Sequence, residues 1–282
     1  MRKFFRNLGI ISLIFFSFYF TEKTVTVIKA ADELMVEIKS KQDNYYKEPI
    51  DGIIKDNTFI PGISGKKINI DKSYKKMKQY GLFNEGLLIY DIVKPKNKLN
   101  NNLDKYIISG NPTKKQVSII LTIDSSNYLD ELLEVLSDNN IYVNFFIEGN
   151  WLEENSHFLS RFISDGHDIG SISYNLDYED SSYPWMDNII KKITKLENNY
   201  CYNIKDNSKT LEVCSRYNNY TIRPSIILDN NYLYNIKQNI KAGSIISLPL
   251  DKEVIKVLPS INNYIKSKGL EVVTLKELLK EE

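Results

Sequence analysis

From residue 117 onward, short apolar segments alternate with amphipathic ones, and this alternation constrains the fold more than any other feature. The apolar segments are rich in β-branched and aromatic residues, as expected of strands buried on both faces; they include 117–123 (VSIILTI), 141–147 (IYVNFFI), 166–173 (GHDIGSIS), 221–224, 244–248 and 271–274. The amphipathic segments have apolar residues at helical spacing; they are 128–136, 151–164, 186–196, 232–240, 254–266 and 275–279. The sequence therefore predicts an α/β fold with a parallel sheet covered by helices, open or closed into a barrel.

The amino terminus has the layout of an export signal. Residues 1–7 (MRKFFRN) are basic, and residues 8–20 form an uninterrupted apolar run. The run has about 13 residues, whereas a bilayer span needs about 20. Residues 1–30 are therefore predicted to be a signal peptide or an uncleaved signal anchor; a buried core helix is a weaker alternative, since the run has no polar face. Either signal places the remaining chain outside the cytoplasmic membrane, secreted or held to the membrane by this segment.

Composition excludes several classes of protein. The chain has 37 Lys and Arg against 36 Asp and Glu, so no global positive field directs it toward nucleic acid. Two Cys and two His are too few for a zinc finger or an iron–sulfur cluster. Outside the cytoplasm Cys201 and Cys214 are expected to form a disulfide, with two buried free thiols as the alternative.

The segment before residue 113 differs in character from the rest. Residues 31–60 are polar and mixed, and we interpret them as an arm with at most one strand. A turn cluster at 61–65 (PGISG) and a short helix ending near Tyr80 follow. The predicted organisation is a signal segment at 1–30, an N-terminal extension at 31–112 and a main domain at 113–282.

Several segments of the main domain resemble motifs of the polysaccharide deacetylases, the NodB-homology group of carbohydrate esterase family 4. The matching segments are VSIILTIDSSN (117–127), FFIEGN (145–150), GHDIG (166–170), IRPS (222–225) and GSIISLPL (243–250). The resemblance covers about residues 116–279. It implies a deformed (β/α) barrel with its site at the carboxyl ends of the strands.

Enzymes of this family hold a divalent metal with one Asp and two His, and the metal activates water. A separate Asp acts as base and an Arg orients it. By the resemblance, Asp124 keeps the position of the base and Arg223 that of the arginine. Ser125 stands at the position of the metal-binding Asp, and Ile172 and Leu176 stand at the positions of the two His ligands.

The same resemblance places Pro249 where the family has the histidine that acts as the general acid. Isoleucine and leucine donate no lone pair to a cation, and a serine hydroxyl is a weak ligand beside a carboxylate or imidazole. We therefore expect no metal and no other cofactor. We interpret Asp124 and Arg223 as a vestigial pair at the top of the barrel, and Ile172 and Leu176 as apolar packing of the former cleft floor.

The remaining candidates have simpler structural explanations. His157 and His167 are expected to be solvated or satisfied by packing, since neither stands at a ligand position. Tyr174 and Trp185 follow the degenerate motif and are candidates for stacking on sugar rings. With 19 Tyr in the chain, ordinary packing is the simpler explanation of such aromatics.

The sequence thus predicts an extracytoplasmic polysaccharide-deacetylase-like protein without deacetylase activity, whose partner is cell-wall glycan or an envelope protein. One alternative is an active hydrolase with a non-standard site, in which Asp124, Arg223, Glu148 and residues 177–180 converge and hold a divalent metal such as Zn. Another is a protein-interaction module that binds its partner through residues 31–110.

Overall fold

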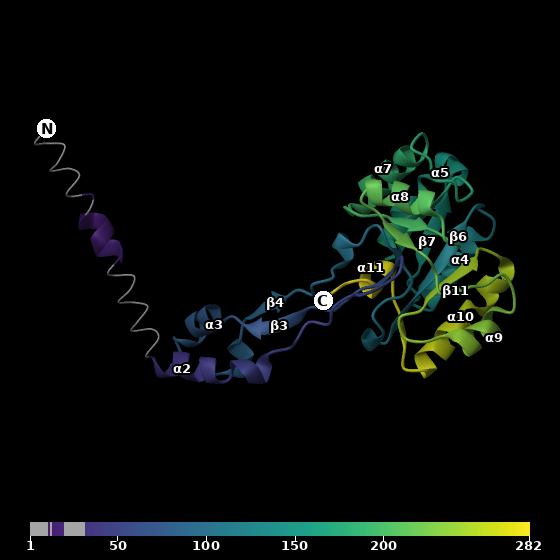
Figure 1. Cartoon of the computed structure of the whole chain (residues 1–282). Coiled ribbons are helices and arrows are strands. Elements are labelled where there is room, and N and C mark those ends of the chain that lie inside the picture. The colour runs from purple at the N-terminus through teal and green to yellow at the C-terminus, as the bar shows by residue number, and fades with distance from the viewer. Residues whose placement is uncertain (1–10, 12, 20–31) are drawn as a thin grey trace, which may run out of the picture. The chain divides into compact units, whose positions relative to one another are not determined.

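The computed structural model describes residues 11, 13–19 and 32–282, and it contains two compact units (Figure 1). The described residues of Met1–Pro49, together with Ser64–Val93, form the first unit. Ile50–Ile63 and Lys94–Glu282 form the second. The predicted signal at residues 1–30 lies largely outside the described residues. None of the helices that the structure describes combines the length and apolarity needed to cross a membrane.

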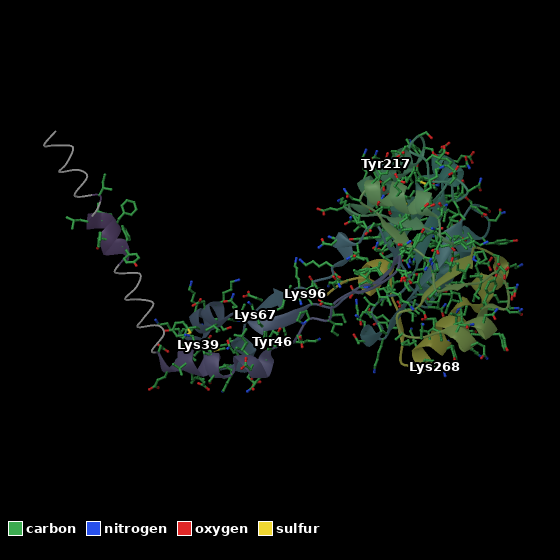
Figure 2. All side chains as sticks on the ribbon, viewed as in Figure 1. Lys39, Tyr46, Lys67, Lys96, Tyr217 and Lys268 are labelled. Atoms are coloured by element: carbon green, nitrogen blue, oxygen red, sulfur yellow. A yellow bond between two sulfur atoms is a disulfide. The ribbon has the colours of Figure 1, made fainter. Side chains whose placement is uncertain are left out.

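The first unit has secondary structure and a core of its own. It contains α2 (Glu33–Ser40), α3 (Ile70–Met77) and an antiparallel pair of β3 (Gly65–Ile68) and β4 (Tyr90–Val93). Its core consists of Leu34, Met35, Ile38, Ile68, Tyr74, Met77 and Leu88. Lys39, Tyr46 and Lys67 belong to this unit, and their side chains are labelled in Figure 2.

The start of this unit corrects the prediction of an arm with at most one strand over residues 31–60. Asp32 caps α2, because its carboxylate accepts hydrogen bonds from the amides of Leu34 and Met35. The apolar spacing of Leu34, Met35 and Ile38 then places one helical face in the core. The segment was too short and too polar for this face to stand out in the sequence.

The second unit is built on an 11-stranded sheet with the order β1-β2-β5-β10-β9-β8-β7-β6-β12-β11, and β13 pairs with β6. Apart from the antiparallel pair of β1 and β2, its described strand pairs are parallel, and the sheet curls into a half-barrel (Figure 1). This confirms the predicted α/β barrel architecture. The strands are β1 (Ile53–Lys55), β2 (Thr58–Ile60), β5 (Tyr106–Ile107), β6 (Gln116–Ile123), β7 (Asn144–Glu148), β8 (Asp168–Ser173), β9 (Tyr200–Tyr202), β10 (Tyr220–Ile222), β11 (Ile226–Ile227), β12 (Ile245–Pro249) and β13 (Glu271–Val272).

The domain boundary expected at residue 112 differs from the division in the structure. Strand β5 lies between β2 and β10 in the sheet, and β1 and β2 extend it further. Residues 50–63 and 94–112 therefore belong to the barrel unit and not to a separate extension. These strands have two or three residues each, which is too short for a clear alternating pattern.

Most of the helices cover the outer face of the sheet; they are α4 (Leu129–Asp138), α5 (Gly149–Asn155), α6 (Phe158–Ser164), α7 (Tyr183–Thr194), α8 (Ser208–Arg216), α9 (Tyr232–Asn239) and α10 (Lys252–Ser267). The short helix α11 (Leu275–Leu278) instead contributes to the core on the inner face. Helix α10 packs against both α4 and α9 on one side of the barrel (Figure 1). The helix predicted at 151–164 is two helices. The Asn155 side chain donates to the carbonyl of Trp151 and competes with continuation of the first helix.

The inner face of the curled sheet carries a second apolar core. Its members include Phe59, Ile107, Ile120, Phe146, Ile172, Tyr200, Tyr202, Tyr220, Ile222, Ile245, Leu275 and Leu278. Across this interior the hydroxyls of Tyr202 and Ser247 lie 2.7 Å apart, so β9 and β12 are joined directly. The interior is thus filled by side chains, and any site of this unit lies at the ends of the strands.

Candidate functional site

The carboxyl ends of the parallel strands bring the predicted site residues to one edge of the sheet. Pro249 on β12 pairs in register with Thr122 on β6, and Ser173 on β8 pairs with Glu148 on β7. The predicted residues stand at or just after these strand ends: Asp124 and Ser125 after β6, Ile172 in β8, Leu176 after β8, Arg223 after β10 and Pro249 at the end of β12. The topology therefore positions all six on the face where barrel enzymes have their sites.

The two positions that the resemblance assigns to ligand histidines are part of the apolar core or packed against it. Ile172 is 9% exposed and belongs to the inner core, and Leu176 packs against that core. The Leu176 amide donates to the Ile172 carbonyl at 2.9 Å, which closes a turn. Within this turn Ser173, Asn175 and Leu176 have φ values of +52°, +50° and +65°, the left-handed region. Neither side chain offers a lone pair to a cation.

No other side chains at these strand ends take the place of the missing metal ligands among the described residues. The Ser125 hydroxyl accepts a 3.0 Å hydrogen bond from the Asn127 amide and so closes a local turn. Among the described residues, no three His, Cys, Asp or Glu side chains are grouped to hold a metal ion. The residues at this edge therefore do not fit the metal that the resemblance implies.

Arg223 and Asp124 do not form the ion pair that we expected. The Arg223 guanidinium pairs with Asp206, and it stacks over the Tyr106 ring at 4.9 Å. Within the described chain, the exposed carboxylate of Asp124 has neither a hydrogen bond nor an ion pair. The strand order explains the exchange: Asp206 follows β9, which is next to β10, whereas Asp124 follows β6, with three strands between.

The acidic residues of the alternative hydrolase site are engaged separately. Glu148 caps α5, because its carboxylate accepts hydrogen bonds from the Trp151 amide at 3.0 Å and the Asn150 side chain at 2.8 Å. The acidic loop forms surface ion pairs with α8: Asp177–Lys209 at 3.2 Å, Glu179–Lys209 at 3.2 Å and Asp180–Arg216 at 2.5 Å. These contacts hold the loop against α8, and they do not bring its carboxylates together with Asp124 and Glu148 as the alternative hydrolase site requires.

The two histidines lie away from the carboxyl ends of the strands; His167 directly precedes the amino end of β8. His167 is buried, packs edge-on against Phe145, and accepts a 3.3 Å hydrogen bond from the Val143 amide through Nδ1. Burial lowers its pKa to about 4, so the ring is neutral at physiological pH. His157 is exposed at the start of α6. Both positions suit the structural roles predicted for them.

The two aromatic candidates differ in their surroundings. The Tyr174 ring covers Gly149 so closely that a Cβ there would lie 2.6 Å from it. Its hydroxyl donates to Glu153 at 2.7 Å, and burial, together with this bond, raises the Tyr174 pKa to about 12. Trp185, near the start of α7, is 43% exposed. Of the two rings, Trp185 presents the larger share of its surface for stacking.

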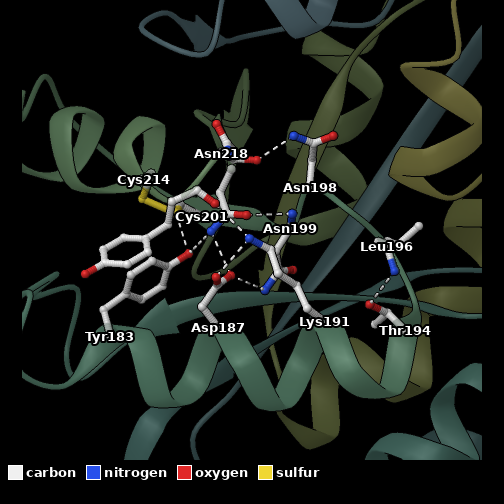
Figure 3. Close-up of polar contacts among 12 residues, drawn as sticks. Tyr183, Asp187, Lys191, Thr194, Leu196, Asn198, Asn199, Cys201, Cys214 and Asn218 are labelled. Carbon is white, nitrogen blue, oxygen red and sulfur yellow. Dashed lines mark hydrogen bonds and ion pairs between the residues drawn. A yellow bond between two sulfur atoms is a disulfide. The ribbon is translucent and has the colours of Figure 1, made fainter.

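A disulfide and a buried polar network fix one side of this edge (Figure 3). Cys201 of β9 is bonded to Cys214 of α8, with a sequence separation of 13. Next to it the buried carboxylate of Asp187 pairs with Lys191 at 2.9 Å and accepts a 2.7 Å hydrogen bond from Asn219. The Tyr183 hydroxyl lies 3.0 Å from the Cys201 sulfur. Together these contacts hold β9, α7 and α8 in one arrangement.

A cavity opens where the chain leaves β9. Residues 203–208 and Leu176 line it, and its volume is about 520 Å³. Asn203 is 7% exposed, and its Nδ2 has no hydrogen-bond partner among the described residues. Asn203 and Asp206 were not predicted as site residues because strand β9 was not predicted. A signal was present, since Asn203 directly follows the short aromatic segment YCY (200–202) and Asp206 lies four residues after it.

Comparison with known proteins agrees with this fold. Residues 110–220 match the family model "Polysaccharide deacetylase". The chain is 40% identical over 157 residues to the uncharacterized protein YlxY of Bacillus subtilis. The matched region covers 54% of this chain and 48% of YlxY. The match thus spans about half the length of that relative.

Two solved structures have a similar fold. One is wild-type BA3943 from Bacillus anthracis, described as a CE4 family pseudoenzyme; it has a TM-score of 0.66 and 22% identity, over 89% of this chain and 96% of that one. The other is a mutant of BA3943 described as having restored enzymatic activity, with a TM-score of 0.66 and 21% identity over 89% and 99% of the two chains. At these identities the likeness concerns the fold.

Proposed function

The chain carries a domain of the polysaccharide deacetylase family, and from this premise we propose that it binds cell-wall glycan without deacetylating it. The observation that supports the loss of activity most directly is the replacement of all three ligand positions by Ser125, Ile172 and Leu176. Two of these side chains pack in or against the inner core of the barrel. A deacetylase of this family needs a cation there to activate water, and apolar side chains hold none.

The groups that would transfer protons in a deacetylase of this family are also altered. Asp124, at the position of the base, is exposed, and Arg223, at the position of the residue that orients it, pairs with Asp206 instead. Pro249, at the position of the acid, has no proton to donate. Loss of the metal ligands, of the acid and of the arrangement around the base together favour a binding role over a catalytic one.

An extracytoplasmic location is part of this proposal. A basic segment followed by an apolar run opens the sequence, and such a layout directs chains for export. The disulfide between Cys201 and Cys214 supports an oxidising compartment. In that compartment the accessible partners are cell-wall glycan and other envelope proteins, including active enzymes that share this fold.

The test uses the purified full-length protein and three measurements. Metal content, acetate release from N-acetylated chitooligosaccharides and peptidoglycan, and co-sedimentation with peptidoglycan are compared with those of an Asp124→Ala variant. We expect sedimentation with glycan, no stoichiometric metal and no acetate release from either protein. Stoichiometric metal together with acetate release that Asp124→Ala abolishes would refute the non-catalytic assignment. Sedimentation of neither protein would refute glycan binding.

A further inference from the structure

We propose that the exposed face of α3, with the turn that follows it, binds the surface of an anionic membrane. The helix belongs to the first unit (Figure 1). We call this face the basic surface; it consists of Lys72, Lys75, Lys76, Tyr80 and Leu82, which are all exposed. The inference goes beyond glycan binding and does not depend on it, because it concerns the unit that does not contain the barrel.

The sequence of α3 separates an apolar face from a basic one. Tyr74 and Met77 are buried in the core of the first unit. Lys72, Lys75 and Lys76 are exposed. At about 100° of rotation per residue, these three lysines fall within a sector of about 100° on the side of the helix away from that core. The helix therefore presents its positive charges together and toward solvent.

The stability of the helix does not account for all of these lysines. Lys72 is the third residue of α3, near the positive end of the helix dipole, where a cation is unfavourable. It also lies one turn from Lys75 and Lys76, and like charges at this spacing repel. Among the described residues, no ion pair engages the three ammonium groups. Asp71 offsets part of this charge, and the face stays positive, so a negatively charged surface relieves both costs.

Two large side chains with apolar surface stand exposed directly after the helix. Tyr80 is 58% exposed and Leu82 is 61% exposed. The amides of Tyr80 and Gly81 donate to the Met77 carbonyl at 2.8 and 3.3 Å, so the chain winds one further turn onto the end of α3. A soluble anionic polymer would leave these two side chains in water. The interface of a membrane takes up both, since tyrosine and leucine bury apolar surface there.

The place of α3 in the chain also favours a membrane. The apolar run at residues 8–20 is the predicted signal or anchor, and residues 21–32 separate it from α2. A segment of this length spans at most about 40 Å. Helices α2 and α3 share one core, so α3 is held near the start of α2. A retained anchor thus keeps the basic surface close to the membrane, and two contacts on one chain bind more tightly than either alone.

The test places an environment-sensitive fluorophore on the basic surface of the full-length protein. The two cysteines of the chain are bonded to each other, so Leu82→Cys supplies a single labelling site. The labelled protein is mixed with vesicles of phosphatidylcholine alone, or of an equal mixture with phosphatidylglycerol. We expect a blue shift of the emission on the mixed vesicles, which weakens as salt is added, and no such shift on neutral ones. A label at Asn263→Cys, on the exposed side of α10, is the control and should not shift on either.

A triple variant separates the charge of this surface from binding through the N-terminal segment. Lys72→Gln/Lys75→Gln/Lys76→Gln removes three charges from exposed positions and keeps residues that favour a helix, so the fold should persist. We expect the labelled triple variant to need at least about tenfold more anionic lipid for half of the shift. Thermal melts verify that each variant is folded.

The matched control removes the same charge elsewhere. Lys252→Gln/Lys256→Gln/Lys266→Gln changes three exposed lysines of α10 and should leave the shift at position 82 unaltered. A shift that is equal on neutral and anionic vesicles, a shift that both triple variants reduce alike, or no shift at all would overturn this membrane surface. Soluble polyphosphate that binds as tightly as the anionic vesicles would assign the surface to a soluble polymer instead. Glycan sedimentation tests the proposed function separately from all of these results.

Discussion

The amide of Leu176 donates a 2.9 Å hydrogen bond to the carbonyl of Ile172, so the two residues that the resemblance places at ligand positions are tied together by their own turn. Both side chains pack on the inner core of the barrel. The side chains at the positions that the resemblance assigns to ligands are here part of, or packed against, the hydrophobic core.

The disulfide should make a large contribution to stability. Cys201 and Cys214 are 13 residues apart, and a cross-link of this length is worth about 3 kcal/mol in the chain-entropy description. We expect the double variant Cys201→Ala/Cys214→Ala to lose about that much free energy of unfolding in urea titrations. Dithiothreitol should lower the stability of the wild type and leave the double variant unchanged. Equal stability of the double variant and of the wild type without reductant would contradict this.

The buried carboxylate of Asp187 should matter far more than an exposed one. Its side chain is 4% exposed, pairs with Lys191 and accepts from Asn219, so Asp187→Asn removes a buried charge from a connected network. We expect a loss of about 2 kcal/mol in unfolding free energy. Asp130→Asn breaks an ion pair with Arg161 in which the Asp side chain is 82% exposed, so it should change the free energy of unfolding very little. Similar losses from both variants would argue against the network.

Protonation of His167 should destabilise the fold as the pH falls. Burial lowers its pKa from 6.5 to about 4, so the unfolded chain takes up this proton more readily than the folded one. The stabilising contribution is complete above pH 6.5 and is lost as the pH falls toward 4. His167→Gln should therefore show a shallower decline of unfolding free energy over this interval. His157→Gln, which removes an exposed imidazole, is the matched control. Parallel curves for wild type and His167→Gln would refute the assignment.

The barrel could be predicted from sequence because its central strands are long and uniformly apolar. Residues 117–123 and 141–147 gave β6 and β7 within a few residues, since burial on both faces leaves an uninterrupted signal. Strands β1, β2, β5 and β9 have three residues or fewer, and at that length no periodicity distinguishes a strand from a loop. The outer strands β1, β2 and β5, the inner strand β9 and the boundary between the two units could therefore not be predicted.

The sequence could predict where the candidate site residues lie in the fold, but not which residues they contact. The motif spacing put Asp124, Ser125, Ile172 and Leu176 at strand ends, which is where the structure has them. It gave no means of knowing that Arg223 pairs with Asp206, because that contact depends on the neighbouring strand β9. Asn203 was missed for the same reason.

Restoring the three ligand types should create a cation site in this chain. Ser125→Asp, Ile172→His and Leu176→His together supply one carboxylate and two imidazoles at the ends of β6 and β8. Position 176 has a φ of +65°, and histidine occurs in this region more readily than most residues, so the turn should tolerate the change. The single variant Ile172→His, with one imidazole, is the control and should gain little affinity.

Titration of Zn²⁺ into the wild type and this triple variant, followed by calorimetry and by metal analysis after dialysis, tests the central claim most directly. The account predicts stoichiometric zinc in the triple variant and none in the wild type. One zinc retained by the wild-type protein, and released on Asp124→Ala substitution, would contradict it.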